Sequence, residues 1–219
     1  MLLAFDTSGP HCTAVLANPD GTPVASRSED IGRGHAEHLM GLVEGVLSEG
    51  RSSWQDIECV GCTTGPGSFT GLRVGLAAAQ GLTLALNKPG VGVSVFEVLA
   101  RAFAEQAKGK PFCIVQDARR EQVYFQAFDG AGRPMAAPSA HDLDALENVF
   151  PALVSKVAGT GANLVSERLA GLAVLDGPNH PLPLHLASAC MGAPATAGLK
   201  PLYLRAADAK PQKQKVVEL

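Results

Sequence analysis

Short apolar runs alternate along this chain with longer stretches in which apolar residues recur every three or four positions. Residues 1–5 and 13–17 are apolar runs on either side of a polar turn, which indicates a β-hairpin. Residues 57–63 form another short run that ends at a Gly-Pro pair, as strands often do. Residues 34–47 and about 68–87 have the helical period and predict two helices. Strands interleaved with helices indicate an α/β fold.

The same strand, acid and turn pattern occurs twice. Asp6 ends the first apolar run, and Asp117 follows a second run at residues 111–116. Residues 121–128 then form a return strand, so Asp6 and Asp117 occupy equivalent points in two similar halves. A duplication of this kind predicts two stacked α/β lobes with a cleft between them.

A polar segment that ends in proline, residues 107–111, is the clearest linker. We therefore expect an N-terminal lobe at residues 1–107 and a C-terminal lobe at residues 108–219, with a last helix able to cross back to the first lobe. In the second half, residues 141–146 predict the start of a helix, and residues 157–161 predict a strand that ends in glycines.

The most informative stretch is the glycine-rich run at residues 65–75, which leads from a predicted strand into a predicted helix. Such a turn brings bare backbone against a phosphate or against another helix, and Ser68 or Thr70 can cap the helix. The P-loop is excluded because residues 71–73 read Gly-Leu-Arg, and the dinucleotide fingerprint is excluded because the glycines are spaced GxGxxxG. Tight packing between strand and helix is the alternative explanation.

The two predicted helices carry faces that suit a partner. Residues Gly71, Gly75, Ala78 and Leu82 recur at intervals of four, three and four, which leaves one face with little side-chain bulk. The helix at residues 34–47 has an apolar stripe wider than one core contact requires, made of Leu39, Met40, Leu42, Val43, Val46 and Leu47. One interpretation of these faces is a partner surface made of Leu39, Met40 and Val43 together with the small-residue face of the second helix. Ordinary buried helices are the other.

Side chains for catalysis or metal binding are sparse. None of the six histidines lies between residues 39 and 140, and the pair His35 and His38 has no evident third ligand, so we interpret them as solvated histidines at a helix start. No Gly-x-Ser-x-Gly elbow is present, which argues against a serine hydrolase. The odd number of cysteines, five, argues against a disulfide framework. Cys59 and Cys62 have the spacing of half a zinc site, but in a strand they point to opposite faces, so we interpret them as buried thiols.

Composition narrows the class of protein. The 219 residues are 46% hydrophobic and 18% charged, as in a soluble globular protein. A net charge of −3 gives no general attraction to nucleic acid, although the tail with Arg205, Lys210, Lys213 and Lys215 is a candidate contact for nucleic acid or a partner as well as a plain solvated terminus. No apolar stretch of transmembrane length and no leader is evident, so we expect no membrane association and a cytoplasmic location.

These residues resemble a known family. The sequence Asp6-Thr7-Ser8, the glycine-rich run, residues 117–119 with Val123-Tyr124, and residues 201–205 are similar, in this order, to the bacterial TsaB (YeaZ) family. The resemblance implies a two-lobed actin-like ATPase-domain fold, as in sugar kinases, Hsp70 and actin. It implies a scaffold subunit in the formation of N6-threonylcarbamoyladenosine at position 37 of tRNAs that read codons beginning with A.

The resemblance also implies partners and a cleft. The expected partners are a TsaD-like catalytic subunit, a TsaE-like ATPase and tRNA through the complex, with a homodimer possible when the chain is alone. A vestigial nucleotide cleft would comprise Asp6, Thr7, Ser8, Asp117, Gly159 and Gly161. Related catalytic subunits hold a metal with a His-x-x-x-His pair after the glycine-rich helix, and residues 93–99 contain no histidine. We therefore expect a non-catalytic chain with no metal and no cofactor.

Two other function classes remain open. An independent ATP-dependent small-molecule kinase of the same fold would need Asp6 or Asp117 to act with Mg²⁺ and a base on the acceptor. A peptidase would need a metal or an activated nucleophile, and neither spacing is present.

Overall fold

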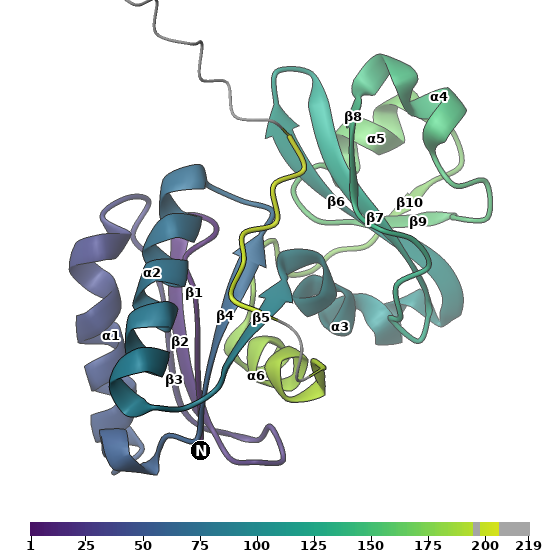
Figure 1. Cartoon of the computed structure of the whole chain (residues 1–219). Coiled ribbons are helices and arrows are strands. Elements are labelled where there is room, and N and C mark those ends of the chain that lie inside the picture. Colours follow the sequence, from purple (N-terminus) through teal and green to yellow (C-terminus); the bar gives the residue numbers. More distant parts are fainter. Residues whose placement is uncertain (195–197, 206–219) are drawn as a thin grey trace, which may run out of the picture.

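A computed structural model describes residues 1–194 and 198–205, so the basic tail beyond Arg205 lies outside the described residues. The strands form two five-stranded sheets (Figure 1). In the first, the order is β3 (Pro23–Asp30), β2 (His11–Ala17), β1 (Leu2–Asp6), β4 (Cys59–Gly65) and β5 (Gly90–Ser94). The β1 to β3 strands are antiparallel, whereas β4 and β5 run parallel to β1.

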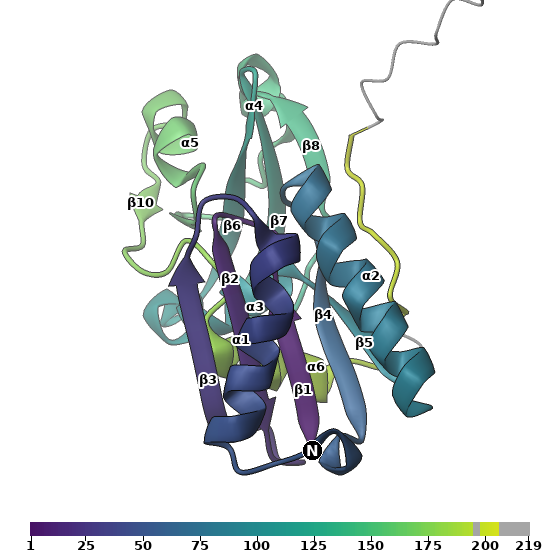
Figure 2. The same ribbon diagram turned by 90° about the vertical axis from the view of Figure 1, so that its left-hand side faces the viewer.

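The central strand β1 is buried on both faces, as its uninterrupted apolar sequence requires. Leu3 and Phe5 point to one side and pack with α1 (His35–Glu49) and α2 (Phe69–Leu86). Leu2 and Ala4 point to the other side and pack with α6 (Pro183–Gly192). Figure 2 shows α1 and α2 side by side over the same face of the sheet.

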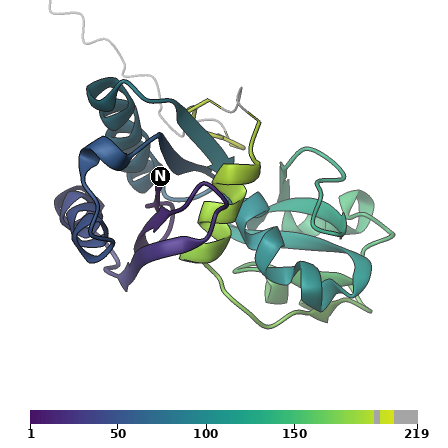
Figure 3. The ribbon, with the colours of Figure 1, turned by 90° about the horizontal axis from the view of Figure 1, so that it is seen from below.

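The second sheet has the order β10 (Ala173–Val174), β9 (Lys156–Ala158), β6 (Gly109–Arg119), β7 (Gln122–Gly130) and β8 (Ser139–Asp142). One face packs on α3 (Val95–Ala107), and the other is covered by α5 (Ala162–Arg168) and α4 (Leu146–Val149). Short 3-10 turns lie at Trp54–Asp56 and Leu143–Ala145. Because α6 contacts both α3 and the first sheet, it lies between the two halves of the molecule (Figure 3).

Local sequence explains where the second helix begins and ends. The Ser68 hydroxyl accepts a hydrogen bond from the backbone N–H of Gly71 at 3.3 Å, which caps the first turn of α2. The helix ends at Asn87, whose left-handed φ of 51° reverses the chain before β5. The predicted helices at 34–47 and 68–87 are thus confirmed, and Ser68 rather than Thr70 is the cap.

Two expectations about secondary structure and hydrophobicity are wrong. The helix expected to start at residue 141 begins only at residue 143, because Ser139–Asp142 pair with β7 as an edge strand, and it consists of one 3-10 turn followed by the four-residue helix α4. The absence of an apolar stretch of membrane-spanning length was also expected, yet α2 is long and apolar enough by length and composition to cross a membrane. One such helix is weak evidence for a span, and α2 packs on β4 in this fold.

Packing of α6 on the first sheet gives a test of the fold. A Cβ added at Gly61 of β4 would lie 2.5 Å from the Cys190 Sγ and 3.1 Å from the Cβ of Ala4. Gly61→Ala should therefore lower the free energy of unfolding by about 1–3 kcal/mol, measured by urea denaturation. Gly41→Ala is the control, because its added Cβ meets no atom within 4 Å and should stabilise α1 by about 0.5–1 kcal/mol. Equal effects of the two substitutions would show that α6 does not pack as described.

Candidate functional site

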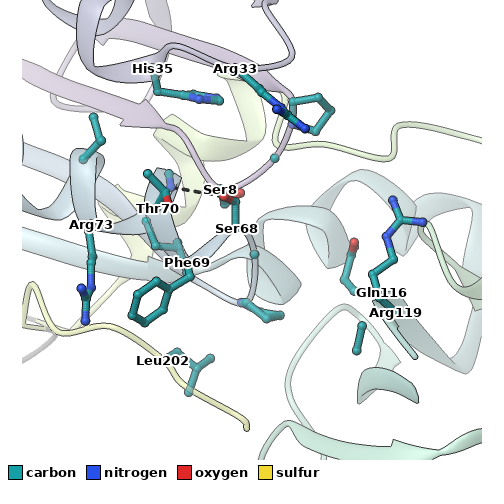
Figure 4. Close-up of a pocket in the computed structure, with 18 of the residues that line it drawn as sticks. Ser8, Arg33, His35, Ser68, Phe69, Thr70, Arg73, Gln116, Arg119 and Leu202 are labelled. Carbon is teal, nitrogen blue, oxygen red and sulfur yellow. Dashed lines mark hydrogen bonds between the residues drawn. The ribbon is translucent and has the colours of Figure 1, made fainter. Parts of the chain in front are cut away.

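A cleft of about 1440 Å³ opens where strand ends of the two sheets face each other. Its walls come from the turn after β1, the start of α1, the start of α2 and the end of β6. Residues 202–205 form a further wall, and we call this segment the strap. Figure 4 shows Ser8, Arg33, Ser68 and Phe69 opposite Gln116 and Arg119 across the open space.

The glycine-rich run packs on the turn after β1. The Thr7 hydroxyl donates to the carbonyl of Gly71 at 2.8 Å, and the Ser68 N–H donates to the carbonyl of Ser8 at 2.7 Å. Added Cβ atoms at Gly71 and Gly75 would collide with the carbonyl oxygen and the Oγ1 of Thr7. The glycines thus serve close packing inside the chain, which is the alternative that the sequence left open.

Asp6 is a buried carboxyl at the base of this turn. One oxygen, Oδ1, accepts hydrogen bonds from the Thr63 hydroxyl and from the Ser8 N–H at 3.1 Å. The other, Oδ2, has no partner among the described residues. Burial raises the pKa of Asp6 above its ordinary value of 3.8, and the hydrogen bonds from Ser8 and Thr63 oppose this rise. Asp6 therefore ties β1 to β4 from within the core and does not line the cleft.

The equivalent acid of the second half is accessible. Asp117 lines the cleft, accepts a hydrogen bond from the Arg119 N–H at 2.7 Å and pairs with the Arg119 guanidinium at 3.1 Å. Its own N–H donates to the Thr160 hydroxyl at 2.9 Å. Gly159 and Gly161 let this loop lie against β6, since added Cβ atoms would meet the carbonyl of Val115 and the backbone of Asp117 and its neighbour Gln116.

Of the expected nucleotide-cleft residues, the structure brings Asp117 together with the two glycines and places Asp6 next to Thr7 and Ser8. Only Ser8 and Asp117 of these six line the cleft, among the described residues. Sequence reasoning missed Thr63. In the sequence, Thr63 is marked only by having a hydroxyl near the end of β4. Its role follows only when β4 is known to be the parallel neighbour of β1.

The predicted partner surface needs correction. Leu39, Val43, Gly71 and Gly75 are buried within the chain, because these positions face the first sheet and the turn after β1. A partner cannot reach them in this fold. Met40 is 38% exposed, and Ala78 and Leu82 are partly exposed, so these three of the predicted seven remain available.

The interpretation of His35 is also wrong. Its ring is buried, and Nε2 lies 3.3 Å from the carbonyl oxygen of His11. The His11 ring in turn stacks on His180, with 3.6 Å between centroids. His11 therefore takes part in the packing between β2 and the loop before α6. His38 is exposed, as expected for a residue at a helix start.

No group of three or more His, Cys, Asp or Glu side chains suited to a metal ion occurs within residues 1–194 and 198–205. Cys59 packs on the α6 side of the first sheet and Cys62 on the opposite side, which confirms that they point to different faces. Burial raises the pKa of the Cys62 thiol to about 12, so it is neutral at physiological pH.

An aromatic and cationic cluster at the cleft mouth was not predicted. Phe69 is 48% exposed and Tyr203 is 47% exposed, with ring centroids 5.7 Å apart. The Arg73 guanidinium lies 3.8 Å from the centroid of Phe69, and its Nε donates to the Tyr203 hydroxyl at 3.5 Å. Residues 69 and 73 share a helix face by their spacing, but only the path of the strap brings Tyr203 to them.

Buried Asp6 makes a pH-dependent contribution to stability. Because its folded pKa is raised, this contribution is fully present below the unfolded pKa and is lost as pH rises through the folded value. The free energy of unfolding of the wild type relative to Asp6→Asn should therefore fall as pH is raised above 3.8, measured by urea denaturation at several pH values. A difference that stays constant with pH would contradict a raised pKa.

Comparison with known proteins places this geometry in a family. Residues 27–170 match the family model of TsaD, tRNA N6-adenosine threonylcarbamoyltransferase. Uncharacterized protein Rv3421c of Mycobacterium tuberculosis is 33% identical over 211 residues, 96% of this chain and 94% of that protein. The tRNA threonylcarbamoyladenosine biosynthesis protein TsaB of Escherichia coli is 34% identical over 127 residues, 58% of this chain and 54% of that protein.

A solved structure agrees with these matches. YeaZ from Pseudomonas aeruginosa superposes with a TM-score of 0.77 at 27% identity, over 93% of this chain and 99% of that chain. The predicted two-lobed, actin-like α/β fold class is thereby confirmed. Since the family model covers more than half of the chain and the structural match spans nearly all of it, the chain belongs to the TsaB (YeaZ) family, which carries a TsaD-type domain.

Proposed function

We propose that this chain is a non-catalytic subunit of the cytoplasmic complex that forms N6-threonylcarbamoyladenosine at position 37 of tRNAs reading codons that begin with A. In this role it binds and supports a TsaD-like catalytic subunit, and a TsaE-like ATPase and tRNA join through the complex. Family membership supports the pathway, since the E. coli relative is named for threonylcarbamoyladenosine biosynthesis. A homodimer on the same surface is expected when the partner is absent.

The observation that carries the proposal is the outer face of α2, which the described residues leave exposed. Although this helix is highly apolar, only 28% of its residues are buried. Leu84 is 85% exposed, and the small residues Ala77, Gly81 and Ala85 are exposed on the same side. Such a face is costly in water and lets the backbone of another helix approach closely.

The neighbouring helix extends this surface. On α1, the exposed positions include Met40 and Gly41, and α1 contacts α2 over the same face of the first sheet (Figure 2). We call the exposed residues Met40, Gly41, Ala77, Gly81, Leu84 and Ala85 the helix-pair surface. Two neighbouring helices that rest on one sheet and expose small and apolar residues suit docking against an equivalent pair on a partner with the same type of domain.

The carboxylates support a non-catalytic role. Asp6 is buried with a raised pKa, and Asp117 is held by the Arg119 guanidinium and backbone. A kinase of this fold would need one of these acids free to hold Mg²⁺ near the acceptor. Neither is arranged in that way, so the scaffold role accounts better for the site.

The helix-pair surface predicts the effect of a single charge. Leu84→Glu should weaken the heterodimer with the TsaD-like protein of the same organism by about tenfold or more, because a carboxylate would be desolvated in an apolar interface. Size-exclusion chromatography with light scattering and titration calorimetry measure this. Leu153→Glu is the matched control, since Leu153 is 75% exposed on the other half of the molecule. If Leu84→Glu assembles as well as the control, the surface is not the interface.

A reconstituted reaction tests the non-catalytic role. With ATP, threonine, bicarbonate, the enzyme that supplies threonylcarbamoyl adenylate, and the TsaE-like ATPase present, modified tRNA should form only when this chain and the TsaD-like protein are both added. Mass spectrometry of tRNA nucleosides measures the product. Product formed with this chain and without the TsaD-like protein would overturn the proposal and favour an enzyme of its own.

A further inference from the structure

The cleft mouth has a charge opposite to that of the whole chain. The chain carries a net charge of −3, yet the charged residues that line the cleft include Arg33, Arg73, Arg119 and Arg205 against the acids Glu37 and Asp117. The Arg119 side chain is 86% exposed even though it pairs with Asp117. Concentrating arginines around one opening creates a local positive potential that favours an anionic ligand.

The same opening offers flat surfaces for stacking. The Arg73 guanidinium already lies over Phe69, and the Tyr203 ring adjoins them. Nucleic-acid bases stack on aromatic rings and on guanidinium planes. The gap between the Phe69 and Tyr203 centroids, 5.7 Å, is too narrow to admit a base between the rings, so a base would stack on the outer side of this cluster.

The hairpin that presents Arg119 is held in an unfavourable backbone conformation. Arg119, Arg120 and Glu121 have consecutive φ values of 62°, 55° and 60°, in the left-handed region that favours glycine. A hydrogen bond of 2.8 Å from the Leu143 N–H to the Glu121 carbonyl helps to hold the turn. Strain of this kind, about 1–3 kcal/mol for each residue, is characteristic of functional loops.

We propose that the cleft mouth binds a single-stranded segment of RNA. Bases stack on the cluster of Phe69, Arg73 and Tyr203, and phosphates contact Arg33 on one wall and Arg119 on the other (Figure 4). The cleft, at about 1440 Å³, exceeds the roughly 300–1,000 Å³ of small-molecule pockets, so it fits several nucleotides better than one. Bases within a duplex are unable to reach the cluster, because their faces are stacked on one another.

This inference rests on the proposed function for the identity of the RNA, which would be a single-stranded segment of the tRNA substrate. The cleft mouth differs in chemistry from the helix-pair surface, which is apolar and lies on the outer side of α1 and α2. Loss of RNA binding and loss of the heterodimer are therefore distinct outcomes that different substitutions produce.

Fluorescence anisotropy of a labelled RNA hairpin with a single-stranded loop, titrated with the full chain, tests the proposal. A blunt RNA duplex of equal length should bind at least fivefold more weakly, and excess ATP should not displace the hairpin. Phe69→Leu and Arg73→Gln should each weaken hairpin binding about fivefold or more through lost stacking. Arg33→Gln should lower the slope of log affinity against log salt by about 0.7, because one phosphate contact is lost.

The control is Arg51→Gln, which makes the same change of charge just beyond the other end of α1, a helix about 22 Å long. It should leave hairpin affinity and its salt slope unchanged. Equal losses with Arg51→Gln, equal binding of the duplex, or displacement by ATP would each overturn the proposal. If the hairpin does not bind while the reconstituted complex still needs this chain, the RNA site is wrong and the scaffold role stands.

Discussion

The contact on which the rest of the structure depends is the packing of the start of α2 on the turn after β1. The Thr7 hydroxyl donates to the carbonyl of Gly71 there, and the N–H of Ser68 donates to the carbonyl of Ser8. Positions 71 and 75 of α2 have no room for a side chain, since Cβ atoms there would collide with the carbonyl oxygen and the Oγ1 of Thr7. This contact places the first two turns of α2, with Phe69 and Arg73, at the wall of the cleft.

The two halves are joined by elements distant in sequence. Helix α6 covers the first sheet and contacts α3, which itself packs on the second sheet. The strap then returns across the cleft, where the Leu202 N–H binds the carbonyl of Thr64 and Arg205 binds Gln122 of β7. Each lobe therefore depends on residues from both parts of the chain. The predicted linker at 107–111 is the end of α3 and the start of β6, so it marks the passage from a helix into the second sheet.

The helix-pair surface and the cleft mouth, which we propose as two contact surfaces, differ in chemistry. The outer face of α2 is apolar and rich in small residues, whereas its first two turns carry the Phe69 ring and the Arg73 guanidinium. One helix can serve both because its N-terminal turn faces the cleft and its later turns face solvent. A catalytic subunit on the helix-pair surface would leave a route for RNA at the cleft mouth, since the two surfaces differ in position along α2.

By itself the sequence determined the elements with strong local signals: the hairpin after residues 1–5, the helices α1 and α2, the serine cap and the repeat of Asp6 and Asp117. These depend on period, caps and turn residues close along the chain. Only the tertiary structure decided which helix faces are buried. Leu39, Gly71 and His35 lie inside the fold, and Asp6 accepts a hydrogen bond from Thr63. The tertiary structure also brought Tyr203 to Phe69, because burial and pairing depend on strand order and chain path, which a local pattern does not contain.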